Sequence, residues 1–222
     1  MPRRIKFFHP LAIRLTHWGN AVFLTAMVAS GLQIFNAYPA FAERGFEFCC
    51  YPFAGMGMPH WARLGGWLAG GQHFHFFFMW LFVLNGIFYL TYVFASGEWR
   101  RRFFFPRDAR GAWQMQLYYL RLRKEKPPYE MYNGLQKLSY TGVVALGALA
   151  VLTGFSIWKP VSLPFLSGAL GGYVLARFWH FLIVWAFLGF LIVHLFMTLV
   201  VDRESLRSMI VGVYREKETD AD

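Results

Sequence analysis

The chain has little charge and few cysteines for its length of 222 residues. Charged residues make up only 15% of the sequence, whereas 57% of the residues are hydrophobic and 20% are aromatic. Soluble domains carry about 25% charged residues, so this composition excludes an ordinary soluble domain and predicts one integral membrane domain. The only cysteines, Cys49 and Cys50, are adjacent. Neighbours form a strained disulfide and are too few for a metal site, so we place no cofactor there.

Acidic residues are also scarce, with 12 Asp and Glu against 22 Lys and Arg and a formal net charge of +10. Such an excess can indicate nucleic-acid binding, but its placement favours a membrane topology. Four cations precede the first apolar run, ten lie between the second and third runs, and four follow the fourth. Cytoplasmic segments of membrane proteins carry this excess. The sequence therefore predicts two cytoplasmic termini, with anionic lipid and not nucleic acid as the partner of the basic surface.

Four long apolar runs account for much of the sequence. Each can cross a bilayer as a helix, which takes about 20 residues. Each is continuous instead of alternating, which argues against a β-barrel. We expect an all-α, integral membrane four-helix bundle that forms a single domain over residues 1–222. The spans are predicted at about 15–35, 74–95, 138–158 and 173–201.

Segments outside the spans are expected to lie along the membrane surface. One short helix is predicted before the second span, from apolar residues at near-helical spacing: Trp61, Leu64, Trp67 and Leu68. A basic arm over residues 1–14 is expected to reach the headgroup region. A helix after the fourth span can be capped by Asp202 or Ser205. Its apolar face would consist of Leu206, Met209, Ile210 and Val213.

Histidines stand in three of the four spans. His180 and His194 are 14 residues apart, which on an ideal helix returns to nearly the same face about 21 Å farther along. In the predicted topology His17 and His194 lie near the inner surface, whereas His75 and His180 lie near the outer surface. Ionisable groups in hydrocarbon are costly and normally functional. The sequence therefore predicts two stacked pairs, His17 with His194 and His75 with His180.

Each predicted pair suits the iron of a b-type haem ligated from both sides. No carboxylate, thiolate or third histidine accompanies either pair in the sequence, which argues against zinc and di-iron sites. Gly31 stands 14 residues after His17, and Gly86 stands 11 after His75. Each glycine therefore shares the face of a ligand and would leave room for the flat macrocycle.

Two arginines stand three residues before predicted ligands, Arg14 before His17 and Arg177 before His180. Residues three apart lie on one helix face, and the forked donors of arginine suit a haem propionate. The alternative is an interfacial arginine whose charged end snorkels to water. That alternative weighs less for Arg177, which lies on the side of the membrane that disfavours cations.

His73 is the alternative ligand in the second span. It stands two residues before His75, about 200° around the helix, so only one of the two can face the bundle. His75 is deeper in the span and shares its face with Phe82 and Gly86. We therefore predict His75 as the ligand.

Three motifs together resemble a known family. They are HPLAIRLTHW at residues 9–18, HFFFMWLFVLNG at residues 75–86, and the His-x13-His spacing of the fourth span. The chain resembles, over nearly its whole length, the bacterial four-helix dihaem cytochrome b family. That family includes cytochrome b subunits of nickel-iron hydrogenases and formate dehydrogenases and cytochromes of periplasmic molybdenum enzymes. The resemblance implies a bacterial inner-membrane protein with two haem b groups, ligated by the two histidine pairs above.

The resemblance implies an electron-transfer subunit between a periplasmic enzyme and the membrane quinone pool. A molybdoenzyme is preferred as partner and a hydrogenase comes next. Candidate quinone-binding residues are His9, Asn133, Lys137 and Tyr140 inside, and Lys159 and Tyr173 outside. A self-contained superoxide:quinone oxidoreductase of the same fold and a haem-free transporter with a histidine proton relay are the alternatives. The direction of electron flow, the quinone and a homodimer are left open.

Overall fold

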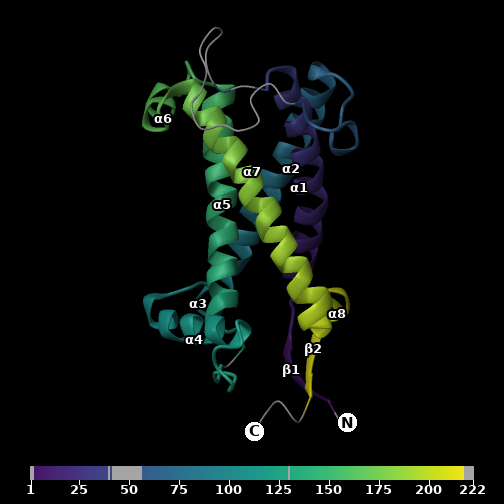
Figure 1. Cartoon of the computed structure of the whole chain (residues 1–222), viewed down its shortest axis with the longest axis vertical. Helices are drawn as coiled ribbons and strands as arrows, with labels where there is room; N and C mark the ends of the chain where they lie inside the picture. Colours follow the sequence, from purple (N-terminus) through teal and green to yellow (C-terminus); the bar gives the residue numbers. More distant parts are fainter. Residues whose placement is uncertain (1–2, 40, 42–56, 130, 218–222) are drawn as a thin grey trace. The chain divides into compact units, whose positions relative to one another are not determined.

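The computed structural model of the protein describes residues 3–39, 41, 57–129 and 131–217 (Figure 1). Four helices in this part of the chain are long and apolar enough to cross a membrane. They are α1 (Leu11–Ala37), α2 (Leu68–Ala95), α5 (Gly134–Trp158) and α7 (Gly172–Phe196), and a π-helical turn, η3 (Met197–Val201), continues α7. The predicted four-span, helical membrane architecture is confirmed. Cys49 and Cys50 lie outside the described residues.

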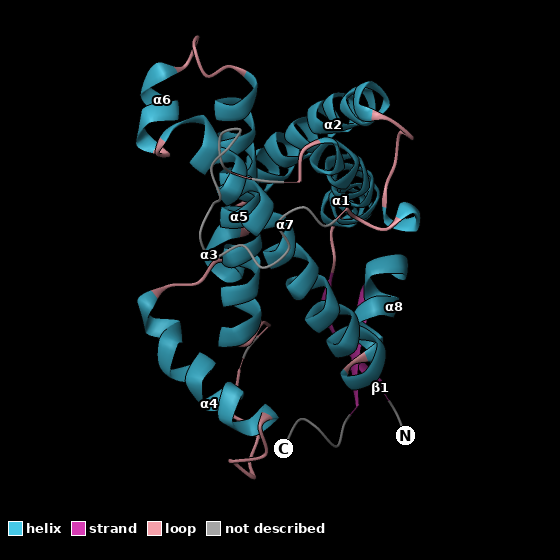
Figure 2. Ribbon diagram, turned by 45° about the horizontal axis from the view of Figure 1, so that its top comes forward, coloured by secondary structure: helices cyan, strands magenta, loops and turns pink. Residues whose placement is uncertain are grey.

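The shorter elements connect or flank these helices (Figure 2). They are β1 (Arg3–Phe8), η1 (His60–Ala62), α3 (Trp99–Arg102), η2 (Pro106–Asp108), α4 (Ala109–Tyr119), α6 (Pro164–Ala169), α8 (Arg203–Val211) and β2 (Val213–Lys217). The chain divides into two compact units, and each long helix contributes residues to both. Unit 1 takes in residues 1–14, 89–148 and 189–222, and unit 2 takes in residues 15–88 and 149–188.

The surface helix predicted from Trp61 to Leu68 is wrong. A single 3-10 turn, η1, is followed by bends, and Leu68 is the first residue of α2. Gly65 and Gly66 have φ angles of 112° and 70°, a region that right-handed helices do not use and that glycine enters readily. The chain therefore turns at these glycines, and the backbone N–H of Leu64 donates to the carbonyl of Ala29 on α1, at 3.0 Å.

Close packing joins α1 to α2 within unit 2. A Cβ at Gly71 would lie 2.9 Å from Cγ of Gln33, so glycine lets the two backbones approach closely there. Farther along, the side-chain amide of Asn85 donates to the carbonyl of Thr16 at 2.9 Å and to Oδ1 of Asn20 at 2.8 Å. These bonds pair polar groups that would be costly in hydrocarbon. The helix α2 begins at Leu68, earlier than predicted, in the region where Gly71 packs against α1. His75 therefore lies seven residues inside it.

Aromatic side chains form the core where α1 meets α7 in unit 2. The Phe35 ring stacks on Phe41 with centroids 5.4 Å apart and on Phe181 with centroids 4.6 Å apart. Leu32 completes the buried cluster. Such pairs add about 0.5–1.5 kcal/mol each beyond the area that they bury. Because Phe181 directly follows His180, this cluster packs α7 against α1 next to that histidine.

Among the described residues, a two-stranded sheet adds to the predicted all-α class. In unit 1, β1 and β2 pair antiparallel near the two ends of the chain, with a bulge between Ile5 and Phe7 (Figure 1). The rings of Phe7 and Tyr214 stack with centroids 4.8 Å apart. The N-terminal arm, predicted to rest in the headgroups, is thus a strand held by the C-terminal tail.

The predicted helix after the fourth span is present as α8, and Asp202 is its cap. The Asp202 carboxylate accepts from the backbone N–H of Ser205 at 3.2 Å, which satisfies a donor that the first turn leaves free. Gly212, with a φ of 90°, ends the helix. Val213 belongs to β2 and not to the apolar face of the helix.

Candidate haem site

Unit 2 brings His75 of α2 and His180 of α7 together. Their ring centroids are 6.2 Å apart and their planes are inclined by 75°. Imidazole nitrogen binds a metal at about 2.0–2.1 Å, so two rings on opposite sides of one metal ion have centres roughly 6 Å apart. The observed separation matches that requirement.

The Nδ1 atom of His75 carries a proton. It lies 3.1 Å from the carbonyl oxygen of Met27, which can only accept a hydrogen bond. It also lies 3.2 Å from Oγ of Ser30, whose own hydrogen is donated to the carbonyl of Ala26 at 2.7 Å. Both neighbours therefore accept from Nδ1, and a neutral His75 keeps the lone pair on Nε2.

The same reasoning holds for His180. Its Nδ1 lies 2.8 Å from Oγ1 of Thr153 on α5. Because Thr153 donates its hydroxyl hydrogen to the carbonyl of Leu149 at 2.7 Å, the hydroxyl oxygen accepts from the imidazole. In both histidines the nitrogen that remains free to bind a metal is therefore Nε2. Partners of this kind orient a ligating imidazole and raise its basicity.

A glycine follows each of these hydroxyl residues. Cβ atoms at Gly31 and Gly154 would each lie 3.4 Å from Cε1 of the neighbouring histidine, His75 and His180 respectively. The glycines thus let each imidazole pack against the backbone of the adjacent helix. Gly31 had been assigned to the face of His17, but the described neighbour that it accommodates is the His75 ring.

Sequence reasoning missed Ser30, Thr153 and Gly154. A partial signal was present, because a hydroxyl residue followed by glycine occurs once in α1, at Ser30, and twice in α5, at Thr141 and Thr153. Ser30 and Thr153 are 0% and 1% exposed, so they are buried polar residues within apolar helices. Serine and threonine in helices commonly bond to their own preceding carbonyls, which hid their second role.

His73 and Gly86 occupy different surroundings. The His73 side chain is exposed and meets the edge of the Phe74 ring, with centroids 6.3 Å apart. A Cβ at Gly86 would meet no atom of the described residues within 4 Å. The assignment of His75 as a ligand and of Gly86 as space for a macrocycle stays a prediction.

The other predicted pair is divided between the units, with His17 in unit 2 and His194 in unit 1. The His17 ring meets Trp18 edge-on with centroids 5.3 Å apart. The His194 ring is stacked with that of Phe190, with centroids 5.6 Å apart. The backbone carbonyl of His194 accepts a hydrogen bond from the Thr198 hydroxyl at 2.9 Å. Their pairing on an inner haem stays a prediction.

The two predicted propionate partners have different contacts. The Arg177 guanidinium donates to the carbonyl of Tyr38 at 3.3 Å and lies near the rings of Tyr38, Phe41 and Tyr173. In unit 1, the Arg14 guanidinium donates to carbonyls at the end of α8, to Met209 at 3.3 Å and to Ile210. Arg14 thus stabilises a helix end, where a cation is favourable. Propionate binding by either arginine stays a prediction.

The residues present in unit 2 fit a bis-histidine haem. In the described ranges no three residues of the types His, Cys, Asp and Glu gather as a metal site. The centre therefore calls for a metal that brings its own equatorial ligands, as the porphyrin of a haem does. His75 and His180 would hold such a group through their Nε2 atoms, and the two hydroxyl acceptors and the two glycines would keep the imidazoles in place.

Comparison with known proteins agrees with this chemistry. The sequence profile of the family described as prokaryotic cytochrome b561 matches residues 9–212. A protein of Azospira oryzae, provisionally named protein-methionine-sulfoxide reductase subunit YedZ1, is 36% identical over 213 residues, 96% of this chain and 100% of that protein. A Bradyrhizobium diazoefficiens protein, provisionally named Ni/Fe-hydrogenase B-type cytochrome subunit, is 25% identical over 232 residues, 95% of this chain and 85% of that protein. No solved structure matches the chain. The chain therefore belongs to the prokaryotic cytochrome b561 family, as a multi-pass, electron-transferring b-type cytochrome of the bacterial inner membrane.

Proposed function

We propose that the protein carries electrons between the membrane quinone pool and a periplasmic reductase through two haem b groups. His75 and His180 would hold the outer haem, and His17 and His194 the inner one. The observation that supports this most strongly is the His75–His180 pair, with ring centroids 6.2 Å apart. A haem with both axial positions filled exchanges electrons without binding oxygen. The fit of that pair to haem b argues against the haem-free transporter.

The partner that we propose reduces methionine sulfoxide. The relative from Azospira oryzae matches along its full length and is named as a subunit of such a reductase. Reduction of one sulfoxide to a thioether consumes two electrons and two protons and releases water, whereas oxidation of one quinol releases two electrons and two protons. Electrons would therefore flow outward from quinol to the partner. A molybdenum cofactor in that partner stays a prediction.

A cluster around Tyr132 in unit 1 is our candidate for the quinone site. The Tyr132 ring meets Tyr140 with centroids 5.3 Å apart and Phe7 with centroids 5.6 Å apart, and Phe7 in turn meets His9 at 5.0 Å. The Arg102 guanidinium lies over the Tyr132 ring, 5.2 Å from its centroid.

Two donors in this cluster support the proposal. The Tyr132 hydroxyl and Nη2 of Arg102 are buried without a hydrogen-bond partner among the described residues, and such groups are costly unless a ligand satisfies them. Burial raises the pKa of Tyr132, so its hydroxyl keeps the proton that a quinone carbonyl would accept. The two donors thus suit the oxygen of a quinone.

The other quinone candidates are already engaged. Asn133 caps α5, because its Oδ1 accepts from the backbone N–H of Gln136 at 2.9 Å. Lys137 forms an ion pair with Asp108 at 2.8 Å. In unit 2, Lys159 lies over the Trp158 ring at 4.7 Å, and Tyr173 lies beside Arg177. We prefer His9 and Tyr140 because both belong to the cluster around Tyr132, where Arg102 keeps Nη2 unpaired among the described residues while its Nε pairs with Glu98 at 3.0 Å.

Anaerobic spectroscopy with a reduced menaquinone analogue tests the proposed route. The quinol is expected to reduce the haems of the purified protein, and methionine sulfoxide is expected to reoxidise them only when the reductase co-purified from native membranes is added. Tyr132→Phe should slow the quinol step and leave dithionite reduction unchanged. Reoxidation without a partner, or rapid reduction by superoxide instead of quinol, would favour the self-contained superoxide:quinone oxidoreductase.

A further inference from the structure

We propose that the segment between α2 and α4 binds the phosphate of an anionic phospholipid between Arg100 and Arg107. Both arginines belong to unit 1 and line a cavity of about 360 Å³ together with Trp99, Phe105 and Pro106. The segment directly follows α2, which ends at Ala95. A chain leaving a membrane span passes through the lipid headgroups, so this cavity is expected at their level.

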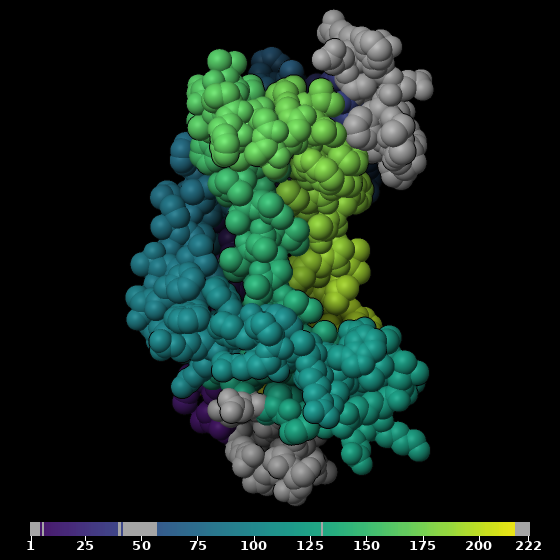
Figure 3. All heavy atoms as spheres, turned by 90° about the vertical axis from the view of Figure 1, so that its left-hand side faces the viewer, coloured from purple at the N-terminus to yellow at the C-terminus, as the bar shows by residue number. Residues whose placement is uncertain are grey.

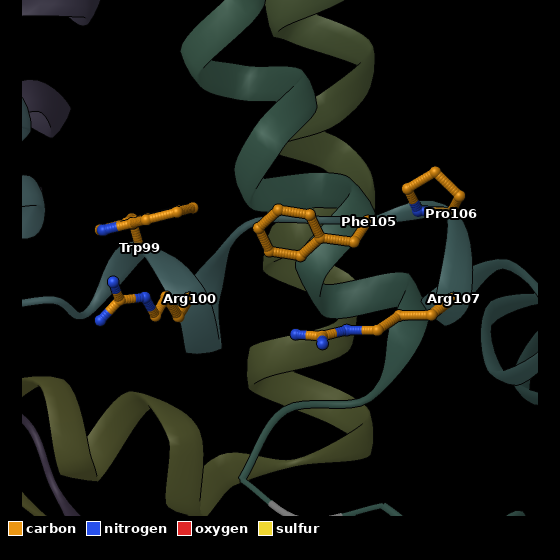
Figure 4. A pocket seen from close by; sticks show the side chains of 5 residues that line it. All are labelled: Trp99, Arg100, Phe105, Pro106 and Arg107. Carbon is orange, nitrogen blue, oxygen red and sulfur yellow. The ribbon is translucent and has the colours of Figure 1, made fainter.

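Each arginine is paired with an aromatic ring. The Arg100 guanidinium lies 5.1 Å from the centroid of the Trp99 ring, and that of Arg107 lies 5.2 Å from the Phe105 ring. The two rings are 6.0 Å apart. Figure 4 shows both guanidinium groups below these rings, with the Arg107 side chain extending toward Arg100. The two cations are thus held on the same side of a shared aromatic surface.

Neither arginine forms a salt bridge within the described residues, although the Asp108 carboxylate lies near enough to Arg107 to interact with its charge. The nearest carboxylates in the sequence are already paired, Glu98 with Arg102 at 3.0 Å and Asp108 with Lys137 at 2.8 Å. No described carboxylate forms a salt bridge with Arg100 or Arg107. Neighbouring like charges repel, and a phosphate between two guanidinium forks would convert that repulsion into charge-assisted hydrogen bonds.

A second cavity extends the site. It measures about 580 Å³ and shares Arg100 and Arg107 with the first. Its lining adds Arg101 and the ion pair of Asp108 with Lys137. The segment around α3 and α4, coloured teal, is exposed on the face drawn in Figure 3. Arg100 and Arg107 are themselves exposed, so a headgroup can reach them from outside. The apolar lining of Trp99, Phe105 and Pro106 favours a lipid over a free phosphate, because it can cover the glycerol and first acyl carbons.

Native mass spectrometry of the detergent-solubilised holoprotein tests the site. The probes are palmitoyl-oleoyl phosphatidylglycerol and, as a zwitterionic control, palmitoyl-oleoyl phosphatidylcholine. The variants are Arg100→Gln/Arg107→Gln and the matched control Arg121→Gln/Arg123→Gln. The control removes the same charge from the part of the α2–α5 connection that follows α4, and neither of its residues lines either cavity. The single variant Arg107→Gln serves if the double variant folds poorly, and haem content reports the fold.

We expect one phosphatidylglycerol to stay bound to the wild type and to the control variant under collisional activation. Its retention should fall at least tenfold in Arg100→Gln/Arg107→Gln and by a smaller factor in Arg107→Gln. Equal retention in all variants, or equal retention of phosphatidylcholine, would overturn the proposal. Millimolar inorganic phosphate should not displace the lipid; full displacement would show that the site takes a soluble anion instead.

Discussion

His75 contacts residues 27–31 of α1, here called the α1 arm, and His180 contacts residues 150–154 of α5, here called the α5 arm. The two arms are built alike but differ in how they bond to Nδ1 of the histidine. In each arm a buried hydroxyl accepts from Nδ1 and the next residue is a glycine packed against the ring. His75 has the Met27 carbonyl and the Ser30 hydroxyl nearly equally close, at 3.1 and 3.2 Å, whereas the nearest acceptor of His180 is the Thr153 hydroxyl at 2.8 Å, with the Ala150 carbonyl as a further partner. The α5 arm therefore relies mainly on one side chain, Thr153, whereas the α1 arm shares the bond between a side chain and a carbonyl.

The largest effect is expected from removing a ligand. His75→Ala should lose one haem of two, because Nε2 of His75 is the free metal-binding atom of that arm, whereas His73→Ala should keep both. Haem per protein, measured as the pyridine haemochrome, distinguishes these results. Loss of haem in His73→Ala but not in His75→Ala would show that His73, and not His75, is the haem ligand of α2.

The glycines should come next. Gly154→Leu and Gly31→Leu would press a side chain against an imidazole that already lies 3.4 Å from the position of a Cβ, and overpacking costs about 1–3 kcal/mol. We expect partial loss of haem in both. Gly142→Leu is the control on α5, since a Cβ at Gly142 meets no described atom within 4 Å. Equal loss in the control would show that the effect is general to the helix.

Replacing the hydroxyls should separate the two arms. Loss of the Nδ1–H bond makes the imidazole less basic, which destabilises ferric haem and raises the midpoint potential. A bond of about 1 kcal/mol corresponds to about 40 mV for one electron. Thr153→Val should raise the potential by up to that amount and Ser30→Ala by less, because the Met27 carbonyl remains. Thr25→Val, which loses a bond only to Ala21, is the control in a potentiometric titration. A larger shift in Ser30→Ala would reverse the comparison.

Arg177 should give the smallest effect, and one of opposite sign. If its guanidinium lies near a propionate of the outer haem, Arg177→Gln removes positive charge and lowers the potential by about 20 mV, since a solvated charge is strongly screened. Lys159→Gln removes the same charge just after the end of α5. A rise in potential, or equal shifts in both variants, would exclude a specific role for Arg177.

Much of this fold was predictable because hydropathy, charge placement and the depth of the histidines are local properties of the sequence. The four spans and the Asp202 cap followed from such signals. The β1–β2 sheet did not, because it joins residues about 210 positions apart, such as Ile5 with Arg215. The start of α2 was also missed, since its glycines indicated a loop where close contact with α1 stabilises a helix.

Part of the site was predictable for the same reason. The four-way match in depth selected His75 and His180, but it could not assign their protons, which depend on residues of other helices. Ser30 and Thr153 bond to their own helix backbones and to the histidines at once. Such a shared acceptor is visible only when the helices are placed side by side.

The central claim is that His75 and His180 bind one and the same haem iron. Haem content of the double variant His75→Ala/His180→Ala, compared with each single variant, tests it most directly. Two haems per protein in the wild type should fall to one in both single variants and remain at one in the double variant. A fall to none in the double variant would place the two histidines on different haems and contradict the claim.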